Sequence, residues 1–200
     1  MPVTYTNRKG VTYHLCQSTT KTGKPRYVFA REPRGAPVEQ IPAGFRISES
    51  ANGRVMLERD RPSLLLPEEI AAVDAAISRR SRPQDYHVAV KHDQIVVSER
   101  PDIGGDDLAS RMGASLGLPA VFTAQIRSVI DSQRSFMPVL RFRLADPERR
   151  IFSAERWCSL GSIDDWIDVG VSGSLAQIAG PTVARLGDDA FYEPFWGEEL

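Results

Sequence analysis

Alternation of apolar and polar residues near the start of the chain is the feature that most constrains its fold. It runs through residues 11–16 and again through residues 26–30, and a period of two is typical of a strand with one buried face. The polar stretch TTKTGK, residues 19–24, separates the two runs. The pattern therefore predicts a β-hairpin, whose core-facing side chains are expected to be Tyr13, Leu15, Tyr27 and Phe29.

The segment FRISESANGRVMLERD, residues 45–60, predicts a second hairpin and also its register. Asn52-Gly53 is typical of a two-residue turn, but that turn would place the apolar side chains of the two strands on opposite faces. Because a shift of one residue turns every side chain of a strand over, we predict a loop of odd length with Gly53 in the left-handed conformation. This register brings together Phe45, Ile47, Val55 and Leu57.

Further hairpins and helices are expected beyond a linker at residues 59–63. A proline at the first position, acidic residues in the first turn and an apolar stripe predict a helix over residues 67–80. The segment YHVAVKHDQIVVSER predicts a third hairpin with a two-residue turn at His92-Asp93, and a fourth hairpin joins residues 138–145 to 150–159.

Three more stretches carry helical patterns. Residues 104–118 and 174–186 each predict a helix, the second with a kink or break at Gly180-Pro181. Residues 119–132 match both a helix and a strand, and Pro119 as a first helical residue favours the helix. The elements together predict an α+β fold: a small N-terminal antiparallel β module of hairpins, residues 1–62, followed by an α+β body with two further hairpins and several helices, residues 63–200.

The distribution of charge points to the N-terminal module as a contact surface. The formal net charge of the whole chain is −1, yet residues 1–34 carry seven lysines and arginines and one acidic residue. Such an asymmetry indicates an anionic partner, and it is equally consistent with the acidic C-terminal end of the chain docking on this basic region.

The leading functional hypothesis is therefore a non-enzymatic binding or adaptor protein that acts through its basic N-terminal hairpin. The partner would be a nucleic acid, with Tyr5 stacking on a base, or an acidic protein surface. A sequence pI near 6.3 argues against nucleic acid, because domains with that role are usually basic. The residues expected to contact the partner are Arg8, Lys9, Lys21, Lys24 and Arg26.

The alternative hypothesis is a metal-dependent hydrolase or nuclease. Its metal ligands would be Asp164, Asp165 and Asp168, with Glu155 and Arg156 nearby, because carboxylates are the ligands that Mg²⁺ prefers. Adjacent aspartates diverge on regular secondary structure, so a capped turn anchored in the core by its tryptophan is the favoured interpretation of this segment.

Other catalytic signals are absent from the sequence. It has no phosphate loop, dinucleotide fingerprint or nucleophile elbow, and its three histidines leave little material for acid–base chemistry. We expect no enzyme activity, no cofactor and no resident metal. No stretch approaches the ~20 apolar residues that cross a bilayer, and no signal peptide begins the chain, so a cytoplasmic location without membrane contact is expected. The sequence leaves the oligomeric state open.

Several short segments resemble an uncharacterised family of bacterial proteins. These are YTNRKG and TGKPRY near the start, IPAGF at residues 41–45, and FSAERWC and GSIDDW late in the chain. The resemblance implies that most of the chain forms one unit. It implies no function, since no activity is established for that family.

Overall fold

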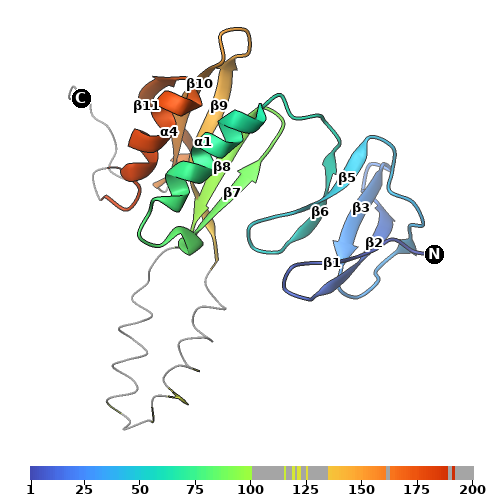
Figure 1. The fold of residues 1–200 in the computed structure, drawn as a ribbon. Helices are drawn as coiled ribbons and strands as arrows, with labels where there is room; N and C mark the ends of the chain where they lie inside the picture. The colour runs from blue at the N-terminus through green and yellow to red at the C-terminus, as the bar shows by residue number, and fades with distance from the viewer. Residues whose placement is uncertain are drawn as a thin grey trace. The chain divides into compact units, whose positions relative to one another are not determined.

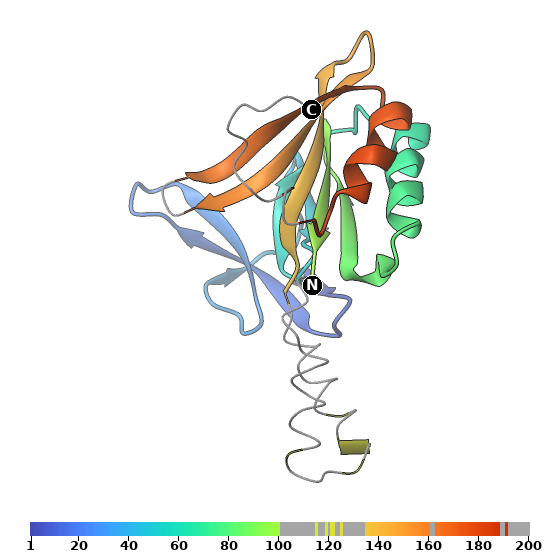
Figure 2. The same cartoon turned by 90° about the vertical axis from the view of Figure 1, so that its left-hand side faces the viewer.

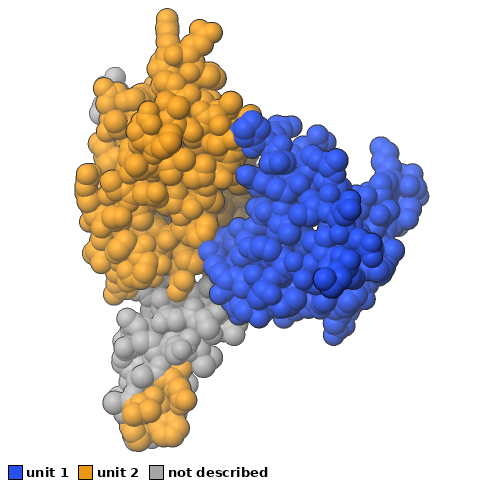
Figure 3. All heavy atoms as spheres, turned by 45° about the vertical axis from the view of Figure 1, so that its right-hand side comes forward, with its two compact units in different colours: residues 1–62 blue, residues 63–200 orange. Residues whose placement is uncertain are grey.

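The computed structural model describes residues 1–100, 135–160 and 163–188, together with a few single residues between and after them. It divides into two compact units, Met1–Pro62 and Ser63–Leu200, which Figure 3 distinguishes by colour. Each unit is described by itself below. The assignment of residues 1–62 and 63–200 as two domains stays a prediction.

Unit 1 consists of two antiparallel β layers (Figure 1). The first sheet has the order β1-β2-β3, with the short β4 paired to β2 on the edge shared with β1. The second layer is the hairpin β5-β6. The strand bounds are β1 Thr4–Thr6, β2 Thr12–Thr19, β3 Pro25–Ala30, β4 Ala36–Pro37, β5 Phe45–Glu49 and β6 Val55–Arg59.

The core of unit 1 lies between these layers and contains the side chains that the alternation predicts. Leu15, Phe29 and Val55 are buried, and Tyr13 and Tyr27 pack against them, which confirms the expected inner face of the first hairpin. Tyr5 is not the exposed ring that the stacking hypothesis requires. Its ring is half-buried against the same core and its hydroxyl donates to Glu49 Oε2 at 3.3 Å.

Three loops of unit 1 adopt the same type of turn. Each loop has three residues, and the third is glycine. In residues 50–54 the N–H of Ser50 bonds the carbonyl of Arg54, and Gly53 has φ +80°, which confirms the predicted odd-length loop. Residues 7–11 and 20–24 repeat this pattern around Gly10 and Gly23. In every copy the first side chain, from asparagine, threonine or serine, also accepts the N–H four residues on. This local bond competes with a continuing strand and fixes each turn.

In the described residues of unit 2, the helices α1 and α4 lie on one face of a five-stranded antiparallel sheet (Figures 1 and 2). The sheet order is β11-β10-β9-β8-β7, and the helices α1 and α4 contact each other as well as the sheet. The architecture is therefore α+β, as expected, with strands predominating. The bounds are α1 Pro67–Ser78, a 3₁₀ turn Pro83–Asp85, β7 Tyr86–Val90, β8 Gln94–Glu99, β9 Met137–Asp146, β10 Ile151–Leu160, β11 Ile163–Gly173 and α4 Leu175–Ala184.

Both predicted hairpins of unit 2 are confirmed. Val88 pairs with Val97 and Val90 with Ile95, the register that a two-residue turn at His92-Asp93 requires. The hairpin β9-β10 turns at Asp146, whose carboxylate accepts the N–H groups of the residues two and three positions on. Apolar side chains on the helix-facing side of this sheet form the core, among them Ile95, Leu140, Phe142, Phe152 and Ala154.

The helices agree with the sequence in part. Helix α1 begins at Pro67 as predicted, and Glu69 of its first turn accepts the N–H of Leu66 at 2.8 Å and pairs with Arg150. Helix α4 does not break at its proline, since it continues through Pro181 to Ala184. The predictions for residues 104–118 and 119–132 lie outside the described residues.

Candidate functional site

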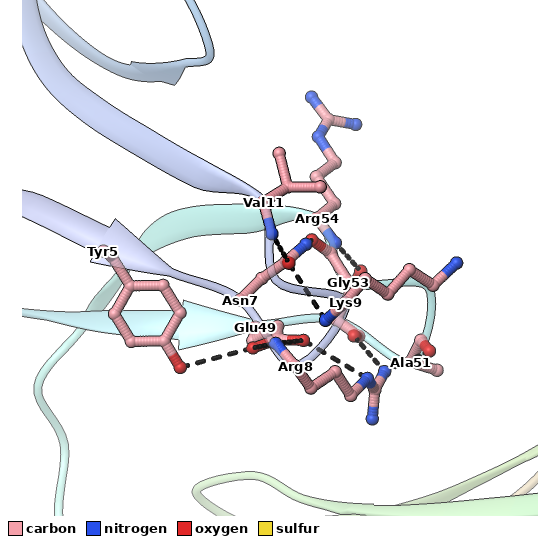
Figure 4. A network of polar contacts seen from close by, with 10 residues as sticks. Tyr5, Asn7, Arg8, Lys9, Val11, Glu49, Ala51, Gly53 and Arg54 are labelled. Carbon is pink, nitrogen blue, oxygen red and sulfur yellow. Dashed lines mark hydrogen bonds and ion pairs between the residues drawn. The ribbon is translucent and has the colours of Figure 1, made fainter.

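Arg8, one of the five predicted contact residues, lies in a contact between two loops of unit 1 (Figure 4). Its Nε is 3.2 Å from Glu49 Oε1, and its guanidinium donates to the carbonyls of Ser50, at 2.7 Å, and Ala51. The charge of Arg8 is thus paired within the unit. Contact with an external phosphate would require these bonds to be given up.

Lys9 belongs to the same contact between loops. Its side-chain carbons lie beside Gly53, because a Cβ built on that glycine would be 3.4 Å from Lys9 Cδ. The neighbouring Asn7 is buried and donates from Nδ2 to the Gly53 carbonyl. The loop of residues 7–11 therefore fastens the hairpin β5-β6 to the first sheet.

Lys21, Lys24 and Arg26 are exposed at the other end of β2. The strand has eight residues, so at ~3.3 Å per residue its two ends are roughly 25 Å apart. The five predicted contact residues thus form two separate groups. The first group contains the ion pair of Arg8. Lys21, Lys24 and Arg26 form no ion pair within residues 1–62, all of which the structure describes.

A groove of about 620 Å³ lies on the outer face of β2 and β3, opposite the core. Cys16 pairs with Val28 and Ser18 with Arg26, so side chains from both strands project into it. We call it the β2-β3 groove. It is lined by Cys16, Ser18, Arg26, Val28, Ala30, Arg31, Glu32 and Arg34.

The far wall of the groove is the segment that links β3 to β4. Since β3 and β4 pair with opposite edges of β2, residues 31–35 must cross that strand, and they do so beside Cys16. A Cβ on Gly35, which has φ +107°, would be only 2.6 Å from the Gln17 carbonyl oxygen, so this close crossing requires glycine. The crossing carries Arg31 and Arg34 to the groove.

The groove combines an apolar floor with a cationic rim. Val28 is 40% exposed at its centre. The rim has three arginines and one carboxylate, and the pair between Arg34 and Glu32 is long, 3.9 Å, and fully solvated, so it neutralises little. Sequence reasoning included Arg26 but missed Arg31 and Arg34 as site residues. The signal for them was Pro33 with Gly35 two residues later, which marks a turn that can return to the sheet.

The three aspartates of the alternative hypothesis do not converge. They lie on strand β11 and not in a capped turn, so Asp165 projects from the opposite face to Asp164 and Asp168, and those two are ~13 Å apart along the strand. The carboxylates of Asp165 and Asp168 accept nearby backbone N–H groups at 2.7 Å. In the described part of the chain no three Asp, Glu, His or Cys side chains are grouped to hold a metal.

Glu155, also named in that hypothesis, is occupied by arginines. It is buried on the sheet face away from the helices, where it pairs with Arg141 and accepts from Arg143 Nε at 3.1 Å. The Arg141 guanidinium also lies 4.7 Å from the ring centre of Trp166, which packs edge-on against Trp157. Arg156 lies on the helix-facing side and is buried. These contacts make Glu155 part of a structural network.

Comparisons with known proteins identify no relative of this chain. No family model, curated protein or solved structure matches it. The resemblance to a bacterial family therefore has no support from them. No helix in the described residues is long and apolar enough to span a membrane.

Proposed function

We propose that the protein is a binding protein that holds an anionic partner in the β2-β3 groove. The observation that carries the proposal is the convergence of three arginines on one groove, Arg26 from β3 and Arg31 and Arg34 from the crossing that follows it. Their guanidinium groups present several donors in a fixed plane and suit carboxylate or phosphate oxygens. Lys21 and Lys24, on the turn at the end of the same hairpin, add to the attraction.

Binding fits these residues better than catalysis does. The groove offers no histidine, and its one carboxylate, Glu32, is exposed on the rim. A general base needs a hydrogen-bonded partner and a perturbed pKa, and a nucleophile needs an activating base. Cys16, whose thiol is buried, lies without a base among the groove residues.

Fluorescence anisotropy with labelled polyanions tests the proposal. The variant R26A/R31A/R34A should lose binding of an acidic peptide or oligonucleotide that the wild-type chain binds at low salt. The matched control is R54A/R59A/R61A, which removes three exposed arginines of the same unit outside the groove. Because both variants change the net charge equally, a non-specific charge effect would weaken binding in both, and that result would contradict the proposal.

A further inference from the structure

The β2-β3 groove has the shape and spacing of an extended chain. Along β3, Arg26, Val28 and Ala30 project into it in turn, so successive contacts are ~6.6 Å apart. An extended peptide presents side chains on one face with the same period. From Arg26 to the end of β3 is ~13 Å, which such a peptide covers in about four residues.

The lining favours a peptide over a nucleic acid. Single strands of nucleic acid are held largely by bases stacked on aromatic side chains, and the groove is lined by none. The aromatic residues of the hairpin, Tyr13, Tyr27 and Phe29, all lie on the core side. What lies between the arginines is a small aliphatic floor, Val28 and Ala30, suited to an alanine or valine side chain.

The rim charge indicates carboxylates spaced along the peptide. Arg26 lies at one end of the groove, and Arg31 and Arg34 come from the crossing beyond the other end of β3. Glu32 lies with Arg31 and Arg34 on the crossing, so the two arginines there exceed the one carboxylate and leave that end cationic. Guanidinium–carboxylate pairs are among the stronger polar contacts, since they can be bidentate.

Resting on the proposed function, we infer that the anionic partner is an extended acidic segment of another protein. It lies along β3 with acidic side chains about four residues apart at Arg26 and at Arg31 and Arg34, and with a small apolar side chain over Val28. This assigns the groove a ligand class, an acidic peptide, and a minimal pattern of acid, small apolar residue and acid.

Anisotropy titrations of the full chain with three labelled probes test this inference. The probes are a peptide with glutamates four residues apart and alanine and valine between, the same peptide with glutamine for glutamate, and a single-stranded oligothymidylate. The acidic peptide should bind and the glutamine peptide should not. Each single variant R26A, R31A or R34A should weaken the acidic peptide roughly threefold to tenfold, and E32Q should strengthen it.

A substitution on the apolar floor distinguishes contact with an apolar side chain of the peptide from attraction by charge alone. Val28→Thr keeps the shape and charge of the groove, and it should weaken the acidic peptide roughly threefold while leaving the oligothymidylate unchanged. Val90→Thr, at a similarly exposed valine of unit 2, is the control that should change neither probe.

The outcomes distinguish the inference from the proposed function. If the oligothymidylate binds through the three arginines and the acidic peptide does not, the peptide inference is wrong and the proposed function stands. If neither probe binds, or if R26A/R31A/R34A binds both like wild type, the proposed function fails and the inference with it. If V28T and V90T weaken binding of the acidic peptide equally, the proposed contact between the peptide and Val28 is wrong.

Discussion

Asn7 Nδ2 donates a hydrogen bond of 2.6 Å to the carbonyl oxygen of Gly53, 46 residues further along the chain. The Asn7 carboxamide oxygen also accepts the N–H groups of Lys9 and Val11, at 3.0 and 2.9 Å. One buried side chain therefore closes its own turn and fastens it to the turn of the hairpin β5-β6. Within residues 1–62 the same turn around Gly23 has no such partner loop, and that copy lies at the end of the hairpin that carries the β2-β3 groove.

Asn7→Ala should destabilise unit 1 by about 1–3 kcal/mol, because it leaves a buried carbonyl and two N–H groups without their partner. Asn7→Asp keeps an acceptor for the turn, but it places a buried carboxylate oxygen against the Gly53 carbonyl oxygen where Nδ2 donated, so its loss of stability should be at least as large. Hydrogen exchange of the full chain measures this locally. Protection should fall across β5 and β6 and stay unchanged in β8 and β9. A uniform change in both units would contradict this role.

Gly53→Ala should cost more than Gly23→Ala, although both glycines have nearly the same left-handed φ, +80° and +78°. The shared backbone strain is about 1–2 kcal/mol. At Gly23 the added methyl group meets no atom within 4 Å, whereas at Gly53 it lies 3.0 Å from Asn7 Nδ2. Crowding there should add about 1 kcal/mol or more. Urea unfolding of both variants measures the difference in unfolding free energy. Equal losses of stability would contradict a close contact between the loops.

Arg141→Ala should destabilise unit 2 by about 2–3 kcal/mol, and Arg143→Ala by less than about 1 kcal/mol. Arg141 is the more buried of the two, pairs with the buried Glu155 through two nitrogens, and stacks on Trp166. Arg143 is half-exposed and gives Glu155 a single bond. Arg141→Lys keeps the charge without the planar stack and should be intermediate. Thermal unfolding supplies the order, and tryptophan emission should shift in the Arg141 variants and not in Arg143→Ala.

Local patterns allowed much of the fold to be predicted from sequence. The loop at Gly53 and the turn at His92-Asp93 follow from which register collects apolar side chains on one face, and that depends only on residues close in sequence. The strand β11 was missed because its Asp164-Asp165 pair is polar. Pairing with β10 and the packing of its tryptophan outweigh the weak strand propensity of aspartate.

The β2-β3 groove could not be predicted from local sequence patterns. Arg31 and Arg34 reach it because residues 31–35 cross β2, and that path depends on the pairing of β4 with the far edge of β2. Likewise, Arg8 is held by Glu49, 41 residues away, and Tyr5 by the same carboxylate. A count of basic residues cannot tell an arginine paired inside the fold from one that lines a groove.

Tyr86 gives unit 2 a stability that depends on pH in the alkaline range. Burial raises the pKa of this phenol above 10.0, and the hydrogen bond from its hydroxyl to Glu99 Oε1, at 2.9 Å, raises it further, partly offset by Arg80. A group whose pKa is raised on folding binds its proton more tightly in the folded state. The contribution of Tyr86 to stability is therefore complete below pH 10 and should be lost as the pH rises from 10 through the folded pKa.

Tyr86→Phe should flatten the fall of unfolding free energy above pH 10, while costing about 1 kcal/mol at neutral pH through the lost bond to Glu99. The difference in phenolate absorbance between wild type and this variant isolates the titration of Tyr86, whose midpoint should lie above 10. Glu99→Gln should lower that midpoint without returning it to the ordinary value, because burial is the larger cause. A midpoint at or below 10 in the wild-type chain would contradict the burial of this side chain between Arg80 and Glu99.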